Sequence, residues 1–152
     1  RSGSPPLVIW YADASFLVSA FGEDANTVEA KAWLRACTTF PLLITRLFVL
    51  ETETALRAAV AGNRLSAAKM NIALAGLHRA TLEGYLHRKD VPQHQWFPQA
   101  HRISAHSKTA SVCRALDVLH ISAAVIFKAG GLLSFDQDQR ALAESEGLKI
   151  SP

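Results

Sequence analysis

The sequence predicts an α/β protein, a three-layer α/β/α sandwich with a central parallel sheet of four to five strands. Short, continuous apolar runs recur along the chain, as expected for strands buried on both faces. Segments with helical spacing of apolar residues separate these runs, and this alternation implies a parallel sheet with right-handed crossovers. A chain of 152 residues can bury a full core, and we expect a single domain.

In the first part of the chain, two predicted strands alternate with three predicted helices. The apolar run 7–12 predicts the first strand, and residues 15–21 a short helix that ends before a glycine. Residues 25–37 have helical spacing, and the apolar stretch 42–45 predicts the second strand. Residues 46–62 read as a helix that again closes on a glycine.

The remainder of the chain continues the alternation less clearly at first. A long amphipathic pattern over 65–87 predicts a helix, and residues 90–98, with two prolines, predict a loop or a short edge strand. The polar segment 99–115 suggests one helix and a turn, and 115–131 a strong helix stopped by Gly-Gly. The last predicted strand, helix and strand cover residues 132–135, 137–147 and 148–150.

Composition excludes several classes of protein. Hydrophobic residues make up 49% of the chain, well above a disordered composition. Two cysteines are too few for a disulfide scaffold and fit a reducing cytosol, so we expect a cytoplasmic protein. No apolar stretch is long enough for a membrane helix, and no membrane partner is expected. Residues 1–6 are interpreted as a cloning remnant and N-terminal tail, and 7–152 as the folded domain.

Positive charge is concentrated in one part of the chain. The net charge is +3, and residues 78–114 contain six basic side chains against two acidic ones, together with five of the six histidines. This bias is compatible with a polyanionic partner such as nucleic acid. The alternative is an ordinary solvated helix face.

Two aspartates directly follow predicted strands. Asp13 follows 7–12 and Asp136 follows 132–135. Ligands of open parallel α/β sheets bind at the carboxyl ends of the strands, so these two acids are expected to meet there. An acid placed after a buried run is costly unless it is paired or binds a metal. The alternative is that each simply caps the helix that follows.

Two further acids lie inside apolar helical segments. Asp117 either stabilises a helix N-terminus or joins the site. His120 lies on the same helix face and could brace Asp117 by a hydrogen bond; a structural role is favoured for this lone histidine over the alternative of a metal ligand. Glu51 lies close to the buried stripe of its helix, whereas Glu53 points elsewhere and is expected to be solvated. Four carboxylates without a histidine or cysteine cluster favour Mg²⁺ or Mn²⁺, and such ions suit phosphodiester hydrolysis.

Four blocks of sequence together resemble the PIN-domain family, and within it the VapC-type toxin ribonucleases of toxin–antitoxin systems. In chain order they are YADASFLVSAF, ITRLFVLETETALRAA, RALDVLHISAAVIF and LLSFDQDQRALAESEGLKI. The resemblance extends from about residue 7 to residue 150. One departure is Ala14, where the family frequently has threonine, which leaves Ser15 to supply the hydroxyl group.

The resemblance implies a PIN-like nuclease domain and a set of functional residues. Asp13, Glu51, Asp117 and Asp136 match the four metal-binding, catalytic acids, and Ser15 is the hydroxyl companion of the first. The implied activity is that of a Mg²⁺- or Mn²⁺-dependent endoribonuclease that cuts structured RNA such as tRNA or rRNA. The implied partners are a second copy in a homodimer and a cognate VapB-type antitoxin.

Other interpretations remain open beside this one. An RNA-processing nuclease unrelated to toxicity, or a non-catalytic RNA-binding regulatory protein, would share the fold. Arg114 is our choice for a phosphate contact, and Asp138 is either an auxiliary ligand or a helix-start charge. Segment 88–114 does not align with the family. Within it, Trp96 and Phe97 are expected either to stack on unpaired bases or to pack a loop onto the body.

Overall fold

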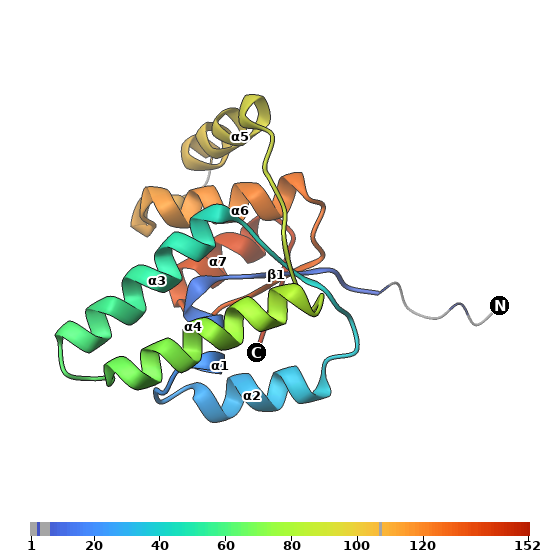
Figure 1. Ribbon diagram of the computed structural model, residues 1–152. Helices are drawn as coiled ribbons and strands as arrows, with labels where there is room; N and C mark the ends of the chain where they lie inside the picture. Colours follow the sequence, from blue (N-terminus) through green and yellow to red (C-terminus); the bar gives the residue numbers. More distant parts are fainter. Residues whose placement is uncertain (1–2, 4–6, 107) are drawn as a thin grey trace.

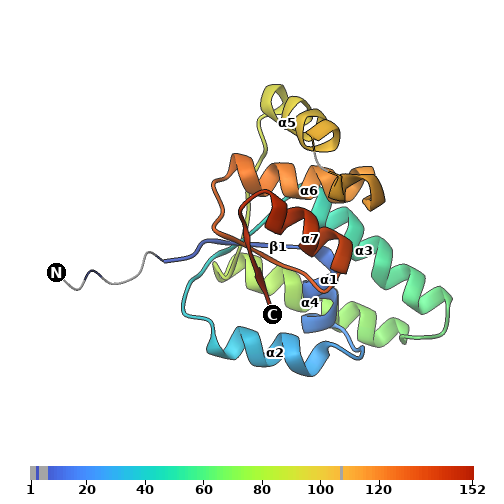
Figure 2. The same cartoon turned by 180° about the vertical axis from the view of Figure 1, so that it is seen from behind.

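A computed structural model of the protein describes residue 3, residues 7–106 and residues 108–152. The predicted cloning remnant and tail, residues 1–6, lie outside the described residues except for Gly3. The described chain forms a five-stranded sheet with helices on both faces, as the two opposite views show (Figure 1, Figure 2). The predicted three-layer α/β/α sandwich with a parallel sheet is therefore confirmed.

All neighbouring strands of the sheet are parallel. The strands are β1 (Trp10–Ala12), β2 (Leu42–Ile44), β3 (Leu86–Arg88), β4 (Gly131–Leu133) and β5 (Lys149–Ser151), in the order β3-β2-β1-β4-β5. The chain moves outward from β1 to β3 and then returns to the other side of β1. The strand order thus reverses beside β1, and ligands of parallel sheets bind at such a switch point.

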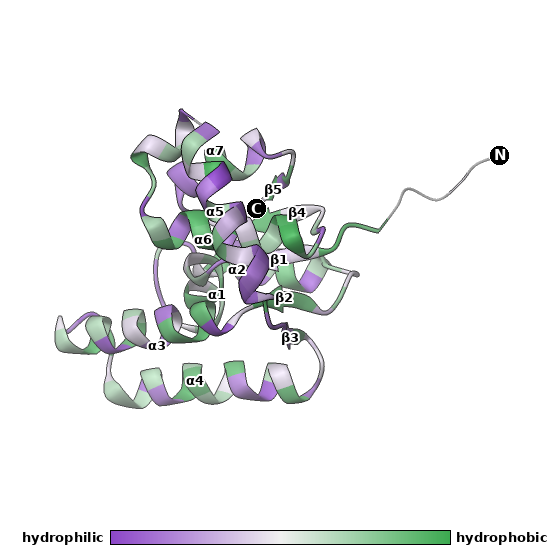
Figure 3. Ribbon diagram, turned by 90° about the horizontal axis from the view of Figure 1, so that it is seen from above, coloured by the Kyte–Doolittle hydropathy of each residue, from purple (hydrophilic) through white to green (hydrophobic). Residues whose placement is uncertain are grey.

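The helices cover the two faces unequally. They are α1 (Ala14–Phe21), α2 (Thr27–Ala36), α3 (Arg46–Ala61), α4 (Ala67–Leu82), α5 (Gln93–His106), α6 (Ala115–Ile126) and α7 (Gln137–Ser145), with a short 3₁₀ helix at Thr109–Val112. Helices α1 to α4 lie on one face of the sheet and α6 and α7 on the other, with α5 packed against the side of α6 that faces away from the sheet (Figure 1). Helices α3 and α4 lie side by side and extend beyond the sheet (Figure 3).

Each face of the sheet has its own hydrophobic core. Phe16, Leu42 and Phe48 belong to the core under α1 to α4, and Tyr11 and Ile121 to the core under α5 to α7. Successive side chains of a strand point to opposite faces, so β1 supplies Tyr11 to one core and Ala12 to the other. This alternation turns Tyr11 toward α6, the helix that carries Asp117 and His120.

The segment between residues 83 and 106 differs from the prediction. The expected helix over 65–87 ends at Leu82, and Leu86, read as a helical apolar position, instead begins strand β3. Gly84 adopts a positive φ of 84°, which turns the chain into that strand. Residues 90–98, predicted as a loop or edge strand, begin helix α5. Pro98 lies inside this helix but is exposed, so water can satisfy the carbonyl group that it leaves unpaired.

Among the described residues, every helix is too short or too polar to span a lipid bilayer. This finding agrees with the absence of a long apolar stretch in the sequence.

Replacing Leu132 by alanine tests the packing of the central sheet. Leu132 is fully buried on β4, and its truncation leaves a cavity, so Leu132→Ala should lower the free energy of unfolding by about 2–5 kcal/mol. Urea unfolding followed by circular dichroism measures this loss. The control is Leu82→Ala, since Leu82 is 73% exposed, and its effect should stay within about 0.5 kcal/mol. Equal effects of the two variants would contradict the packing.

Candidate metal centre

Asp13 directly follows the central strand and is almost fully buried. Its backbone N–H donates to the carbonyl of Leu133 at 2.9 Å, which continues the pairing of β1 with β4. Its side chain also caps helix α1 by accepting a hydrogen bond from the Ser15 backbone amide at 3.3 Å. Just 5% of the residue is exposed, so its charge needs compensation beyond a cap.

Neutral donors surround the Asp13 carboxylate. The Ser15 hydroxyl donates to Oδ2 at 2.7 Å, and the Ser134 hydroxyl donates to the same oxygen at 3.0 Å. The buried Gln139 amide, oriented with its nitrogen toward Asp13, donates to Oδ2 at 2.7 Å and to Oδ1 at 3.2 Å. These donors orient the carboxylate without cancelling its negative charge, which remains available to a cation.

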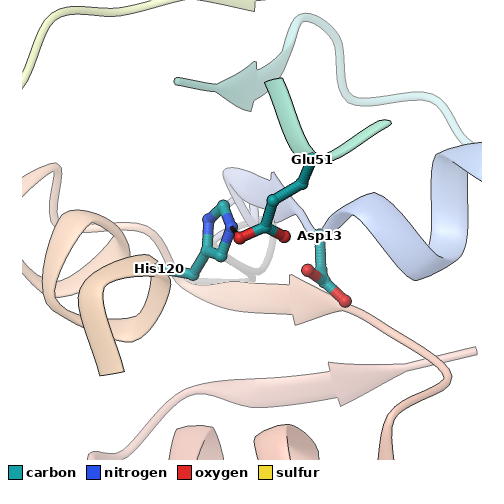
Figure 4. Close-up of side chains that lie close together, drawn as sticks. All are labelled: Asp13, Glu51 and His120. Carbon is teal, nitrogen blue, oxygen red and sulfur yellow. Dashed lines mark ion pairs between the residues drawn. The ribbon is translucent and has the colours of Figure 1, made fainter. Parts of the chain in front are cut away.

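Glu51 and His120 approach Asp13 from two different helices (Figure 4). Glu51 lies on α3 with its side chain 23% exposed, and His120 lies on α6, fully buried. One potential ligand atom from each of the three residues lies within 4.8 Å of the other two. The structure therefore gathers three side chains that are far apart in sequence into one small cluster.

A buried hydrogen-bonded chain holds His120 from behind. Its Nδ1 lies 2.6 Å from the Tyr11 hydroxyl, which in turn lies 3.2 Å from the Thr45 hydroxyl. Burial is the main cause that raises the pKa of Tyr11; the Thr45 hydrogen bond lowers it, and the charges of Asp13 and Glu51 raise it further. Tyr11 therefore stays a neutral phenol and fixes the plane of the His120 ring.

Two atoms of the cluster lack a hydrogen bond. His120 Nε2 and Glu51 Oε1 are 3.1 Å apart, but the pair does not meet hydrogen-bond geometry. Within the described part of the chain both atoms are buried without a hydrogen-bond partner. Buried polar atoms are rarely left unpaired. Two carboxylates and one imidazole with unused lone pairs fit a divalent metal ion, so the donor set agrees with the metal that the resemblance implies.

The other two predicted acids border this cluster without entering it. Asp117 accepts a hydrogen bond from the Arg114 backbone amide at 3.0 Å. Asp136 caps α7 by accepting a hydrogen bond from the Gln139 backbone amide at 3.0 Å. Burial raises the pKa of Asp117 most, and the charges of Asp136 and Asp13 raise it further, against the lowering effect of the Arg114 backbone hydrogen bond. These carboxylates therefore act on one another electrostatically.

The remaining predicted site residues lie at the rim or behind the acids. Arg114 precedes α6 with its side chain 85% exposed, and its Nε lies 4.0 Å from Asp117 Oδ2. Ser15 uses its hydroxyl on Asp13, and that hydroxyl also accepts from the Phe135 amide at 3.0 Å. Asp138 lies in the first turn of α7, which agrees with a helix-start charge.

The structure contradicts the predicted contact of His120 with Asp117 and decides between the two alternatives for Trp96. His120 does not brace Asp117, because its two ring nitrogens face Tyr11 and Glu51. Trp96 is a packing residue, since its indole N–H donates to the Leu119 carbonyl at 2.8 Å and its ring lies against the core. Phe97 is 55% exposed. Glu53 pairs with Arg57 at 3.4 Å on the surface, as its predicted solvation requires.

Sequence reasoning missed the residues that support Asp13 and His120. Ser134 and Gln139 lie on either side of Asp136, within a predicted strand and a predicted helix, and Tyr11 falls within a predicted apolar strand. The one available signal was His120 in a helix otherwise filled with core residues. Their roles depend on contacts between β1, β4, α6 and α7, which no local pattern encodes.

A cavity in the described structure lies away from the acid cluster. It has a volume of about 510 Å³ and lies between α3, α4 and β3, lined by residues such as Phe48, Leu77 and Arg88. None of the four predicted acids lines it. This cavity is therefore separate from the acid cluster.

Comparisons with known proteins identify the fold. No family model matches the sequence, and no curated protein matches it. Among solved structures, the crystal structure of FitAcB from Neisseria gonorrhoeae is similar, with a TM-score of 0.64 and 14% sequence identity. The similarity covers 95% of this chain and 97% of that chain. The expected resemblance to PIN domains is thereby confirmed at the level of the fold.

The crowding of acids predicts a pH dependence of stability in the ion-free protein. The pKa of the Asp117 carboxyl is higher in the folded than in the unfolded protein. The protonated carboxyl therefore contributes to the free energy of unfolding, and this contribution is complete below the ordinary aspartate pKa of about 3.9. That support is lost as the pH rises through the folded-state pKa. Asp117→Asn keeps an oxygen for the Arg114 amide but removes the charge. In EDTA, it should raise Tm at pH 7 more than at pH 4.

Thermal unfolding of the two proteins at both pH values checks this expectation. For a chain of this size, each kcal/mol moves Tm by roughly 2–4 °C. Asp24→Asn, an exposed aspartate remote from the cluster, is the control and should show no such pH-dependent gain. A Tm difference for Asp117→Asn that grows toward acid would contradict the electrostatic interaction.

Proposed function

We propose that this chain is a metal-dependent endoribonuclease, the toxin component of a type II toxin–antitoxin pair, which hydrolyses phosphodiester bonds in structured RNA such as tRNA or rRNA. The observation that carries the proposal is the convergence of Asp13 and Glu51 at the carboxyl edge of the sheet, with Asp117 and Asp136 beside them. Segments separated by more than a hundred positions in the chain contribute to this one negatively charged site.

The four acids are proposed to hold Mg²⁺ or Mn²⁺ and to carry the catalysis. When bound, such an ion activates water and neutralises charge on a phosphodiester. Asp13 is presented as an oriented, charged ligand because its neighbours Ser15, Ser134 and Gln139 are neutral donors. In the ion-free state the acids repel one another, which is the electrostatic reason why a cation would bind here.

Basic residues near the same edge of the sheet support a polyanionic substrate. Arg46 begins α3 directly after β2, and Arg88 ends β3 in register with Ile44. Both are exposed. Because parallel strands end at one edge of the sheet, the backbones of these residues lie at the edge where Asp13 follows β1. Together with exposed Arg114 beside Asp117, they supply phosphate contacts around the acids.

The toxin assignment extends the resemblance of the four sequence blocks and the shared fold with FitAcB. It implies a VapB-type antitoxin partner, a homodimer and action in the cytoplasm. An RNA-processing nuclease unrelated to toxicity would have the same acid cluster, and a non-catalytic RNA-binding protein would not require it. Cleavage and growth experiments separate these alternatives.

The nuclease is tested by Asp13→Asn. Asparagine retains an oxygen that can cap α1, so the fold should persist, whereas loss of the ligand charge should reduce cleavage at least about 100-fold. The assay follows purified tRNA and rRNA with Mg²⁺ or Mn²⁺ and maps the new ends, which should be 5′-phosphate and 3′-hydroxyl. Glu53→Gln, on the same helix as Glu51 but paired on the surface, should cleave normally.

An unchanged rate for Asp13→Asn would remove that residue from the catalytic set. No cleavage by the parent chain with either ion, across the tested RNAs, would favour the non-catalytic RNA-binding alternative.

The toxin role is tested by expression in bacteria. Induction of the parent chain should arrest growth, and induction of Asp13→Asn at the same protein level should not. Coexpression of the gene adjacent to its own in the source genome should restore growth, because the proposed antitoxin binds and inhibits the enzyme. Cleavage in vitro with unimpaired growth would instead favour an RNA-processing nuclease.

A further inference from the structure

We propose that His120 is a nitrogen ligand of the divalent metal, so that the centre combines the carboxylates of Asp13 and Glu51 with one imidazole. This inference deepens the proposed function and rests on its metal dependence. It differs from the sequence expectation, in which oxygen ligands alone hold the ion and the histidine is structural. It also predicts which ion the protein prefers.

The position of His120 Nε2 is the first argument. The side chain is fully buried, and Nε2 points into the space beside Glu51 and Asp13 (Figure 4). Glu51 Oε1 is 3.1 Å away without hydrogen-bond geometry, and neither atom has a hydrogen-bond partner among the described residues. A structural histidine would normally satisfy both ring nitrogens. Here one nitrogen is satisfied and the other faces two carboxylates.

The contact at the other ring nitrogen is the second argument. Metal-binding histidines usually donate their second N–H to a fixed acceptor, which sets the tautomer. The Tyr11 oxygen, 2.6 Å from Nδ1, can accept that proton, because the Tyr11 hydroxyl can donate to Thr45 Oγ1 at 3.2 Å. In the tautomer with the proton on Nδ1, which this chain of hydrogen bonds accommodates, the Nε2 lone pair is free. That lone pair then faces the Glu51 oxygen, and a cation resolves the repulsion between them.

The mixed ligand set has a consequence for metal choice. Mg²⁺ prefers oxygen ligands, whereas imidazole nitrogen favours first-row transition ions. Mn²⁺ accepts both carboxylate and imidazole ligands. We therefore expect this protein to bind Mn²⁺ at least about tenfold more tightly than Mg²⁺, and to lose most of that preference when His120 is replaced.

The decisive experiment is pulsed electron paramagnetic resonance of the full chain loaded with one equivalent of Mn²⁺. The protein is prepared with natural histidine and, in parallel, with histidine labelled by ¹⁵N in the ring. The proposal expects electron spin echo modulation from a directly bound imidazole ¹⁴N, which changes to the ¹⁵N pattern on labelling. Tightly bound Mn²⁺ without histidine-derived modulation would overturn the proposal, and so would failure to bind Mn²⁺.

Variants assign the nitrogen to one residue. His120→Asn should abolish the histidine modulation and weaken Mn²⁺ binding, measured by calorimetry, by at least about tenfold. His94→Asn, an exposed histidine on α5, is the matched control and should change neither. Tyr11→Phe should keep the modulation, since it removes the contact that orients the ring but not the ligand. If His120→Asn does not fold, the labelled parent protein still decides whether a histidine binds the ion, and His120 is the histidine that the described structure places beside the Asp13 and Glu51 carboxylates.

The outcome is separable from that of the proposed function. Histidine modulation in a protein that cleaves no RNA would support the ligand and refute the nuclease. RNA cleavage with Mn²⁺ bound but no histidine modulation would support the nuclease and refute the ligand.

Discussion

The negative charge buried at the end of the central strand is the main physical constraint on the site and its surroundings. Asp13 follows β1 with little exposure to water, and Glu51 approaches it from α3. Two carboxylates held together away from water repel each other and are costly. Neutral donors around Asp13 lower that cost without removing the charge. A bound cation would offset the remaining repulsion between the two carboxylates.

The topology explains how such a site forms from distant segments. The strand order reverses beside β1, so the ends of β1 and β4 open into a crevice that helices from both layers can reach. From one layer α3 supplies Glu51, and from the other α6 supplies His120 and α7 supplies Gln139. Tyr11, on the alternate face of β1, then links the sheet to α6 through His120. The contact between Tyr11 and His120 therefore both packs α6 onto the sheet and orients a side chain of the site.

Most of the secondary structure followed from local patterns, and the exceptions have physical causes. Strand β3 was read as the end of a helix, because Leu86 continues the helical spacing and the turn at Gly84 leaves no strong signal. Pro92 and Pro98 predict a loop or edge strand where the first part of helix α5 lies, but Pro98 occupies an exposed helix position that tolerates it. Of the acids, Asp13 and Glu51 entered the cluster as predicted, whereas Asp117 and Asp136 border it. His120 was assigned the wrong neighbour, since its nearest acid in sequence is not its nearest acid in space.

Local sequence patterns specify the α/β architecture, the position of an acid after each of two strands, and the presence of two more acids within apolar helices. These features are local, because periodicity and strand ends depend on residues close in the chain. The packing of helices onto the sheet sets which of these groups meet, brings an imidazole to the carboxylates, and places Ser134 and Gln139 against Asp13. Such contacts join residues that are between 38 and 126 positions apart in the chain, and side-chain direction and helix packing, rather than sequence spacing, set them.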